Sequence, residues 1–130
     1  MDIVVDSSAL LAALLDEPER QRMIELTSGH SLIGPGCIPW EIGNAFSAML
    51  KRRRVVIEAA RAAVAIFEAV PIRYVGIDMV EAVAIADRLG IYAYDAYYLA
   101  CAMRQHAPLL TLDRSLMGSA RGLGVQVMEV

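Results

Sequence analysis

The chain has 130 residues, which is near the usual length of one domain and long enough to bury a sizeable core. Hydrophobic residues make up 57% of it, yet no apolar stretch approaches the roughly 20 residues that a membrane-spanning helix needs. We therefore expect one globular domain over residues 1–130. The net charge of −3 argues at first sight against a nucleic-acid partner, although local rather than total charge decides such binding.

The first half of the chain alternates short apolar runs with helical segments. The run DIVV is typical of a buried strand, and SSALLAALLD has the composition of a helix. Pro18 suits the first turn of a second helix, and Pro39 suits the first turn of a third. The expected elements are a strand at 2–5, helices at 7–16 and 18–27, a strand at 31–34, and helices at 39–53 and 55–70.

The second half continues the alternation. Asp78 and Gly90 are typical of the first and last positions around a helix. The expected elements are a strand at 72–75, helices at 78–90 and 94–107, a strand at 108–113, a short helix at 114–120 and a last strand at 125–130. Short apolar strands separated by helices predict a three-layer α/β/α fold, in which a short parallel sheet is flanked by helices.

Four acidic residues fall where strands lead into helices. Asp6 closes the first strand, Asp113 closes the strand at 108–113, Asp95 opens a helix, and Glu41 lies in the first turn after Pro39. Ligands of such sheets bind beyond the carboxyl ends of the strands. Carboxylate oxygens are the ligands that Mg²⁺ prefers. Acids are also common at helix starts for local reasons, so position alone does not distinguish a metal site from helix caps.

Several other kinds of site are disfavoured. Cys37 and Cys101 are far apart and lack metal-ligand spacing, so we expect buried free thiols. His30 and His106 are isolated, which leaves no pair for acid and base catalysis. A haloacid-dehalogenase-like phosphatase would need a second Asp where Ser8 stands. A receiver domain would need a late lysine, and Lys51 is the chain's only one.

The segments VVDSSALLA, PWEIGNA, ADRLGIYAYDAYYLACA and LLTLDRSL, in this order, resemble the PIN-domain family, particularly the VapC-type toxins of type II toxin-antitoxin pairs. The resemblance covers nearly the whole chain. It implies that Asp6, Glu41, Asp95 and Asp113 bind Mg²⁺ or Mn²⁺, with Ser8 and Asn44 in support.

The resemblance also implies an endoribonuclease that hydrolyses RNA phosphodiester bonds to leave a 5′-phosphate and a 3′-hydroxyl, and a cognate antitoxin that inserts a segment near the active site. A non-catalytic RNA-binding or scaffold module of the same fold is the alternative. The opening MDIVVD does not resemble a secretory signal, so we expect a cytoplasmic protein with no membrane partner.

Two further features leave alternatives open, and a third gives a single prediction. The only basic run, Lys51, Arg52, Arg53 and Arg54, either complements a helix C-terminus or contacts RNA or a partner. The cluster of Tyr92, Tyr94, Tyr97 and Tyr98 around Asp95 either stacks on bases or packs in the core. The apolar helices over 39–70 predict a homodimer.

Overall fold

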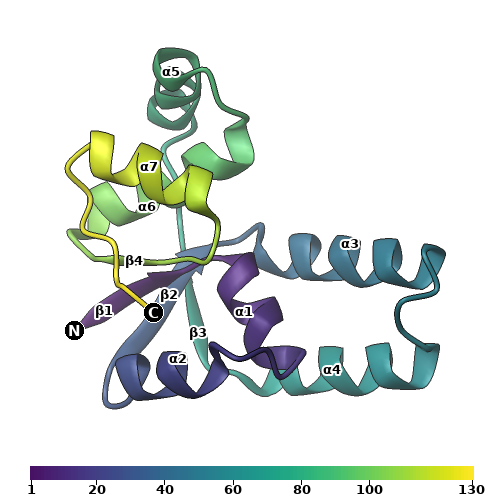
Figure 1. The fold of residues 1–130 in the computed structure, drawn as a ribbon. Helices are drawn as coiled ribbons and strands as arrows, with labels where there is room; N and C mark the ends of the chain where they lie inside the picture. The colour runs from purple at the N-terminus through teal and green to yellow at the C-terminus, as the bar shows by residue number, and fades with distance from the viewer.

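The centre of the molecule is a four-stranded parallel sheet with the strand order β3-β2-β1-β4. The computed structural model describes residues 1–130. The strands are β1 (Asp2–Val5), β2 (Ser31–Pro35), β3 (Ile72–Val75) and β4 (Leu109–Leu110). Ile3 lies opposite Leu32, and Val5 lies opposite Leu110. Figure 1 shows this sheet between two groups of helices, as the predicted three-layer fold requires.

The strand order explains which helices cover which face. Six helices lie between the strands and a seventh follows β4: α1 (Ser7–Leu14), α2 (Arg20–Thr27), α3 (Ile38–Lys51), α4 (Ile57–Ala69), α5 (Met79–Leu89), α6 (Ala93–Gln105) and α7 (Arg114–Gly122). The chain moves outward from β1 to β3 through α1–α4, and then returns past β1 to β4 through α5 and α6. Because parallel crossovers are right-handed, the reversal places α5–α7 on the other face from α1–α4 (Figure 1).

This reversal also locates the crevice where a ligand is expected. β1 and β4 are neighbours whose following helices, α1 and α7, leave toward opposite faces of the sheet (Figure 1). The crevice beyond the carboxyl ends of two such strands is the usual ligand site of parallel α/β sheets. The fold therefore points to the residues that follow Val5 and Leu110.

The core forms around β1 and α6. Ile3 and Val4 have no exposed surface, because β1 is a central strand with helices on both faces. On α6, Leu99 is fully buried and Tyr98 nearly so. These residues belong to one hydrophobic cluster of 28 buried residues that includes side chains from both helix layers. β1, which leads directly to Asp6, and α6, which carries Asp95, are thus among the most deeply buried elements of the molecule.

Most predicted elements are confirmed within a few residues. Gly90 takes the left-handed conformation at the end of α5, with φ of 64°. The helix predicted from Pro18 begins only at Arg20, because residues 17–19 form a turn in which Arg20 N–H donates to Glu17 O. None of the helices combines the length and the apolar character needed to cross a membrane.

Two predicted strands are wrong in extent. The strand expected at 108–113 is limited to Leu109–Leu110, because side-chain hydroxyls take the next backbone N–H groups: Leu112 N–H donates to Ser8 and Asp113 N–H to Thr111. The last strand, expected at 125–130, is reduced to a single parallel bridge between Leu109 and Val127. Because β4 has only two residues, the C-terminal segment has no longer strand to pair with.

Candidate active site

Asp6 is the centre of the candidate site. Its side chain is only 3% exposed, directly after β1. One carboxylate oxygen, Oδ1, accepts the backbone N–H of Ala9 at 3.0 Å, which makes Asp6 the N-cap of α1. Ser8 Oγ lies 2.7 and 2.9 Å from the two carboxylate oxygens, and Thr111 Oγ1 donates to Oδ2 at 2.5 Å.

These contacts act in opposite directions on the charge of Asp6. Burial raises the pKa of the Asp6 carboxyl, while the hydrogen bonds from Thr111, Ala9 and Ser8 lower it. The negative charge of Asp113 raises the pKa further, and the net result is a raised pKa. Asp6 is therefore more than a helix cap, because a cap alone would not require a carboxylate buried beside a second acid.

Glu41 lies in the first turn of α3 and is held by two other helices. Ser7 Oγ donates to Oε1 at 3.1 Å, and Tyr98 OH donates to Oε2 at 2.9 Å. Cys37 lies beside them: burial, together with the nearby Glu41, raises the pKa of the Cys37 thiol to about 12. Burial and Glu41 likewise raise the pKa of Tyr98, so its hydroxyl remains a donor.

Asp95 and Asp113 complete the set of acids. Asp95 lies in the first turn of α6, three residues after the N-cap Tyr92, and so is not itself the cap. Burial raises the pKa of Asp95, and the charges of Asp113 and then Glu41 raise it further. Asp113 is exposed and caps α7, where its Oδ1 accepts the N–H of Leu116 at 3.1 Å. The charges thus link the four acids in series: Asp113 acts on Asp6 and on Asp95, and Glu41 acts on Asp95.

The donor chemistry of this edge fits a hard divalent cation. Four carboxylates contribute only oxygen ligands. Burial first, and then the charge of neighbouring acids, raises the pKa of Asp6 and Asp95, and a bound cation would offset both effects. As the side chains are placed, no group of three His, Cys, Asp or Glu residues is close enough to hold one metal ion. Asp95, which accepts no hydrogen bond, is the least restrained of the four.

The other predicted residues divide into two groups. Ser8 contacts Asp6 directly. The side chain of Asn44 is exposed, and only its backbone carbonyl accepts a side-chain hydrogen bond, from Ser47. The exposed run Lys51–Arg54 lies at the opposite end of α3 from Glu41, about 15 Å along the helix axis. The basic run is therefore separate from the acidic edge, the part of the sheet edge that carries Asp6, Glu41, Asp95 and Asp113.

Three hydroxyl side chains that organise the acids, Ser7, Thr111 and Tyr98, were not predicted in this role. Of the two alternatives for Tyr98, packing in the core is confirmed, since its side chain is buried. Thr111 precedes Asp113 by two residues, which mirrors Ser8 two residues after Asp6. Tyr98 follows Asp95 by three residues and so lies on the same face of α6. Hydroxyl residues at these spacings from an acid were the available signal.

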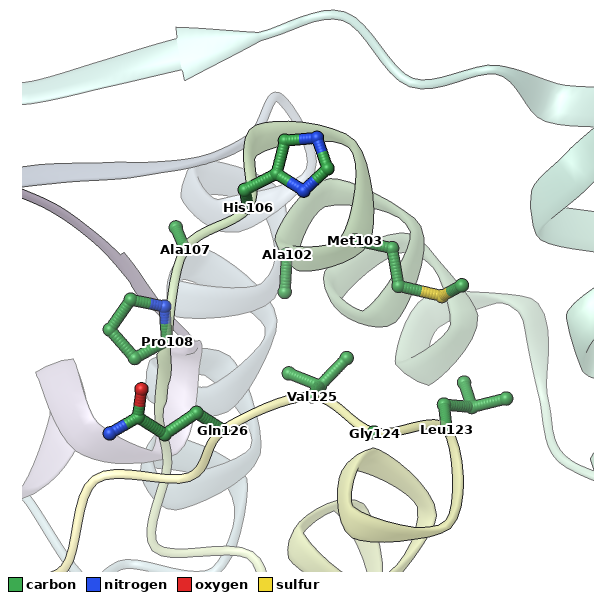
Figure 2. A pocket seen from close by; sticks show the side chains of 9 residues that line it. All are labelled: Ala102, Met103, His106, Ala107, Pro108, Leu123, Gly124, Val125 and Gln126. Carbon is green, nitrogen blue, oxygen red and sulfur yellow. The ribbon is translucent and has the colours of Figure 1, made fainter.

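An open pocket elsewhere on the molecule has different chemistry. Figure 2 shows it between the end of α6 and the loop after α7, with Met103, His106 and Val125 among its lining residues. Its volume is about 360 Å³, and it contains no acid. Pro108 places it before β4, at the end of that strand away from Asp113. The acids, rather than this pocket, mark the candidate active site.

Comparison with known proteins agrees with this geometry. The family model of the PIN domain matches residues 3–118, and the chain belongs to that family. No curated protein sequence matched the chain.

Three solved structures share the fold. PAE2754 from Pyrobaculum aerophilum has a TM-score of 0.73 and 24% identity, over 94% of this chain and 81% of that one. VapBC2 from Rickettsia felis, bound to a DNA fragment from their promoter, has a TM-score of 0.68 and 13% identity over 98% of both chains. VapC20 from Mycobacterium tuberculosis, a toxin that cleaves the sarcin-ricin loop, has a TM-score of 0.61 and 17% identity over 90% and 94%.

We expect Thr111→Val to lower the free energy of unfolding by about 1.5 to 3 kcal/mol, because it removes a buried hydrogen bond to a carboxylate. The substitution also removes the acceptor of the Asp113 N–H while preserving side-chain volume. Thr111→Ser is the control, since it keeps the hydroxyl and loses one buried methyl group. Urea unfolding in EDTA measures both. A valine variant as stable as the wild type would contradict the described network.

Proposed function

We propose that this chain is a metal-dependent endoribonuclease whose site is formed by Asp6, Glu41, Asp95 and Asp113. The observation that carries the proposal is that acids from four separate segments act on one another: the charge of Asp113 acts on Asp6 and on Asp95, and the charge of Glu41 acts on Asp95. PIN-domain proteins are typically nucleases, and the family match supports the same reading. We further propose that residues 1–130 act as one nuclease unit.

The residues have distinct roles in this proposal. Asp6, Glu41 and Asp95 would hold Mg²⁺ or Mn²⁺, with Asp113 as a further ligand or as the residue that orients water. A bound cation would supply an activated water and neutralise charge on the scissile phosphate, so no histidine base is required. Ser8 and Thr111 fix the Asp6 carboxylate, and Ser7 and Tyr98 fix that of Glu41. Fixed carboxylates lower the reorganisation needed during reaction.

We also propose that the protein is the toxin of a toxin-antitoxin pair, that it acts in the cytoplasm, and that it binds a cognate antitoxin. The fold shared with VapBC2 and VapC20 supports this part of the proposal. A short DNA-binding protein encoded beside this chain would support it further. The alternative is a non-catalytic PIN-like module that binds RNA or serves as a scaffold, and an RNA-cleavage assay with and without EDTA distinguishes the two.

Glu41→Gln tests the catalytic role of the acids. We expect the rate of RNA cleavage to fall about a hundredfold or more, because a group that positions transition-state charge is lost. Stability in EDTA should be unchanged or higher, since one of four repelling charges is removed. The glutamine can still accept from one hydroxyl and donate to the other. Melting temperature in EDTA and initial rates across a Mn²⁺ titration measure both effects.

A Glu41→Gln variant that melts lower yet cleaves RNA at the wild-type rate would remove Glu41 from the site. The role of Glu41 would then be limited to the start of α3, where a first-turn acid stabilises a helix by about 0.3 to 1 kcal/mol.

Replacing Arg52, Arg53 and Arg54 together by Gln tests the exposed basic run. We expect RNA binding to weaken and its salt dependence to flatten by about one unit of slope for each phosphate that an arginine no longer binds. Because the run lies far from Glu41, Mn²⁺ affinity should be unchanged. Binding isotherms at several salt concentrations measure the slope. An unchanged slope would assign these residues to the end of α3 or to a protein partner.

We propose that the protein forms a homodimer, supported by the large apolar side chains exposed along α3 and α4. Trp40 is 76% exposed, and Val56, Ile57 and Ile66 are also exposed. Trp40 also lines a surface hollow together with apolar residues such as Val64 and Phe67 of α4, and apolar patches of this kind are common sites of association. Light scattering at tens of micromolar is expected to give the mass of two chains. The mass of one chain at that concentration would contradict the prediction.

A further inference from the structure

Glu41 is held differently from the other hydrogen-bonded acids of the site. Asp6 and Asp113 each accept a backbone N–H at the start of a helix. Glu41 accepts no backbone N–H; its two oxygens each accept one side-chain hydroxyl, from Ser7 on α1 and from Tyr98 on α6. The orientation of the Glu41 carboxylate therefore depends on residues from two other helices rather than on its own helix.

Tyr98 is the more rigid of the two donors. Its side chain is 2% exposed and belongs to the hydrophobic core, so the ring has little freedom to move. Its hydroxyl lies 2.9 Å from Glu41 Oε2. Ser7 is only half-buried at the first position of α1, and its contact is longer at 3.1 Å. Tyr98 consequently fixes Glu41 to the core, and Ser7 holds the second oxygen.

Neutral hydroxyl donors suit an acid that must still bind a cation. A carboxylate offers about four lone-pair positions on its two oxygens, and one hydroxyl on each oxygen leaves the remaining positions available. An arginine or lysine partner would instead cancel the charge that attracts the metal. No cationic side chain forms an ion pair with Glu41. The arrangement thus restrains the carboxylate while preserving its charge.

We propose that Tyr98 is a positioning residue that, with Ser7, holds the Glu41 carboxylate in the orientation needed to bind the divalent cation. This inference rests on the proposed metal-dependent nuclease function. Groups that orient metal ligands typically change metal affinity by 10- to 100-fold when they are lost. The competing explanation is that Glu41 only satisfies the buried hydroxyl of Tyr98, in which case the bond contributes to stability and not to metal binding.

The test compares Tyr98→Phe with Tyr97→Phe. Tyr97 is the neighbouring tyrosine on α6. Its ring packs edge-on against that of Tyr94, with the ring centroids 5.8 Å apart. Its hydroxyl donates to none of the four acids. Each variant loses one hydroxyl and keeps its ring. Mn²⁺ affinity is measured without RNA by electron paramagnetic resonance, RNA cleavage is measured across a Mn²⁺ titration, and the melting temperature is measured in EDTA.

We expect Tyr98→Phe to weaken Mn²⁺ binding about tenfold and Tyr97→Phe to leave it unchanged. Because the ligand itself remains, cleavage by Tyr98→Phe should recover largely at high Mn²⁺, unlike cleavage by Glu41→Gln. In a Glu41→Gln background, Tyr98→Phe should have no further effect on Mn²⁺ affinity, since the two side chains act through one contact. Ser7→Ala, a small change at a half-buried position, should weaken Mn²⁺ binding severalfold.

The outcomes separate this inference from the function on which it rests. A wild-type protein that binds Mn²⁺ and cleaves RNA, with Tyr98→Phe and Ser7→Ala binding Mn²⁺ as the wild type does, would overturn the positioning role and leave the nuclease function standing. A wild-type protein that neither binds Mn²⁺ nor cleaves RNA would overturn both. If Tyr98→Phe does not fold, Ser7→Ala alone decides, because it removes the other half of the same support.

Discussion

The structure depends on the burial of the Asp6 carboxylate between the ends of β1 and β4. Transferring a charged group out of water is costly unless hydrogen bonds replace its solvation, and here Ala9, Ser8 and Thr111 supply them. Thr111 is itself fully buried, and the Ser8 hydroxyl also accepts the N–H of Leu112. The carboxylate and its partners consequently tie the β1–α1 connection to the segment that leads into α7, which lies on the opposite face of the sheet.

The same network explains why β4 is so short. Backbone N–H groups that would extend the strand beyond Leu110 are bound instead by the hydroxyls of Ser8 and Thr111. The chain therefore turns away from the sheet, and Asp113 becomes the exposed N-cap of α7 next to the crevice. A longer β4 would have placed Asp113 within the strand or at its end, without the capping geometry. The shortness of the strand is thus tied to the position of this acid.

The sheet was predicted from local patterns, whereas the four acids were predicted from their positions at strand ends together with the resemblance to the PIN-domain family. Apolar runs such as DIVV mark buried parallel strands, and acids at strand ends fall on one edge of such a sheet. The contacts that organise the acids are tertiary: Tyr98 and Glu41 are 57 residues apart, and Thr111 and Asp6 are 105 apart. The last strand was predicted wrongly because VQVMEV has a strand's composition, while the length of its partner is set by the hydroxyl network.

The electrostatics of the four acids predicts that a bound cation would stabilise the folded protein. In the metal-free protein, burial and neighbouring carboxylates raise the pKa of Asp6 and Asp95, so their charged forms are disfavoured relative to the unfolded chain. An ion that binds the folded form alone would stabilise it by RT ln(1 + [L]/Kd), and it would remove the repulsion at the same time. Because Glu41 is restrained by uncharged donors, its charge remains available for that ion. The basic run at the far end of α3 cannot provide this neutralisation, since it lies about 15 Å along the helix from Glu41. Under the proposed function, a cation bound beside the acids would therefore be what lets an RNA phosphate approach them closely.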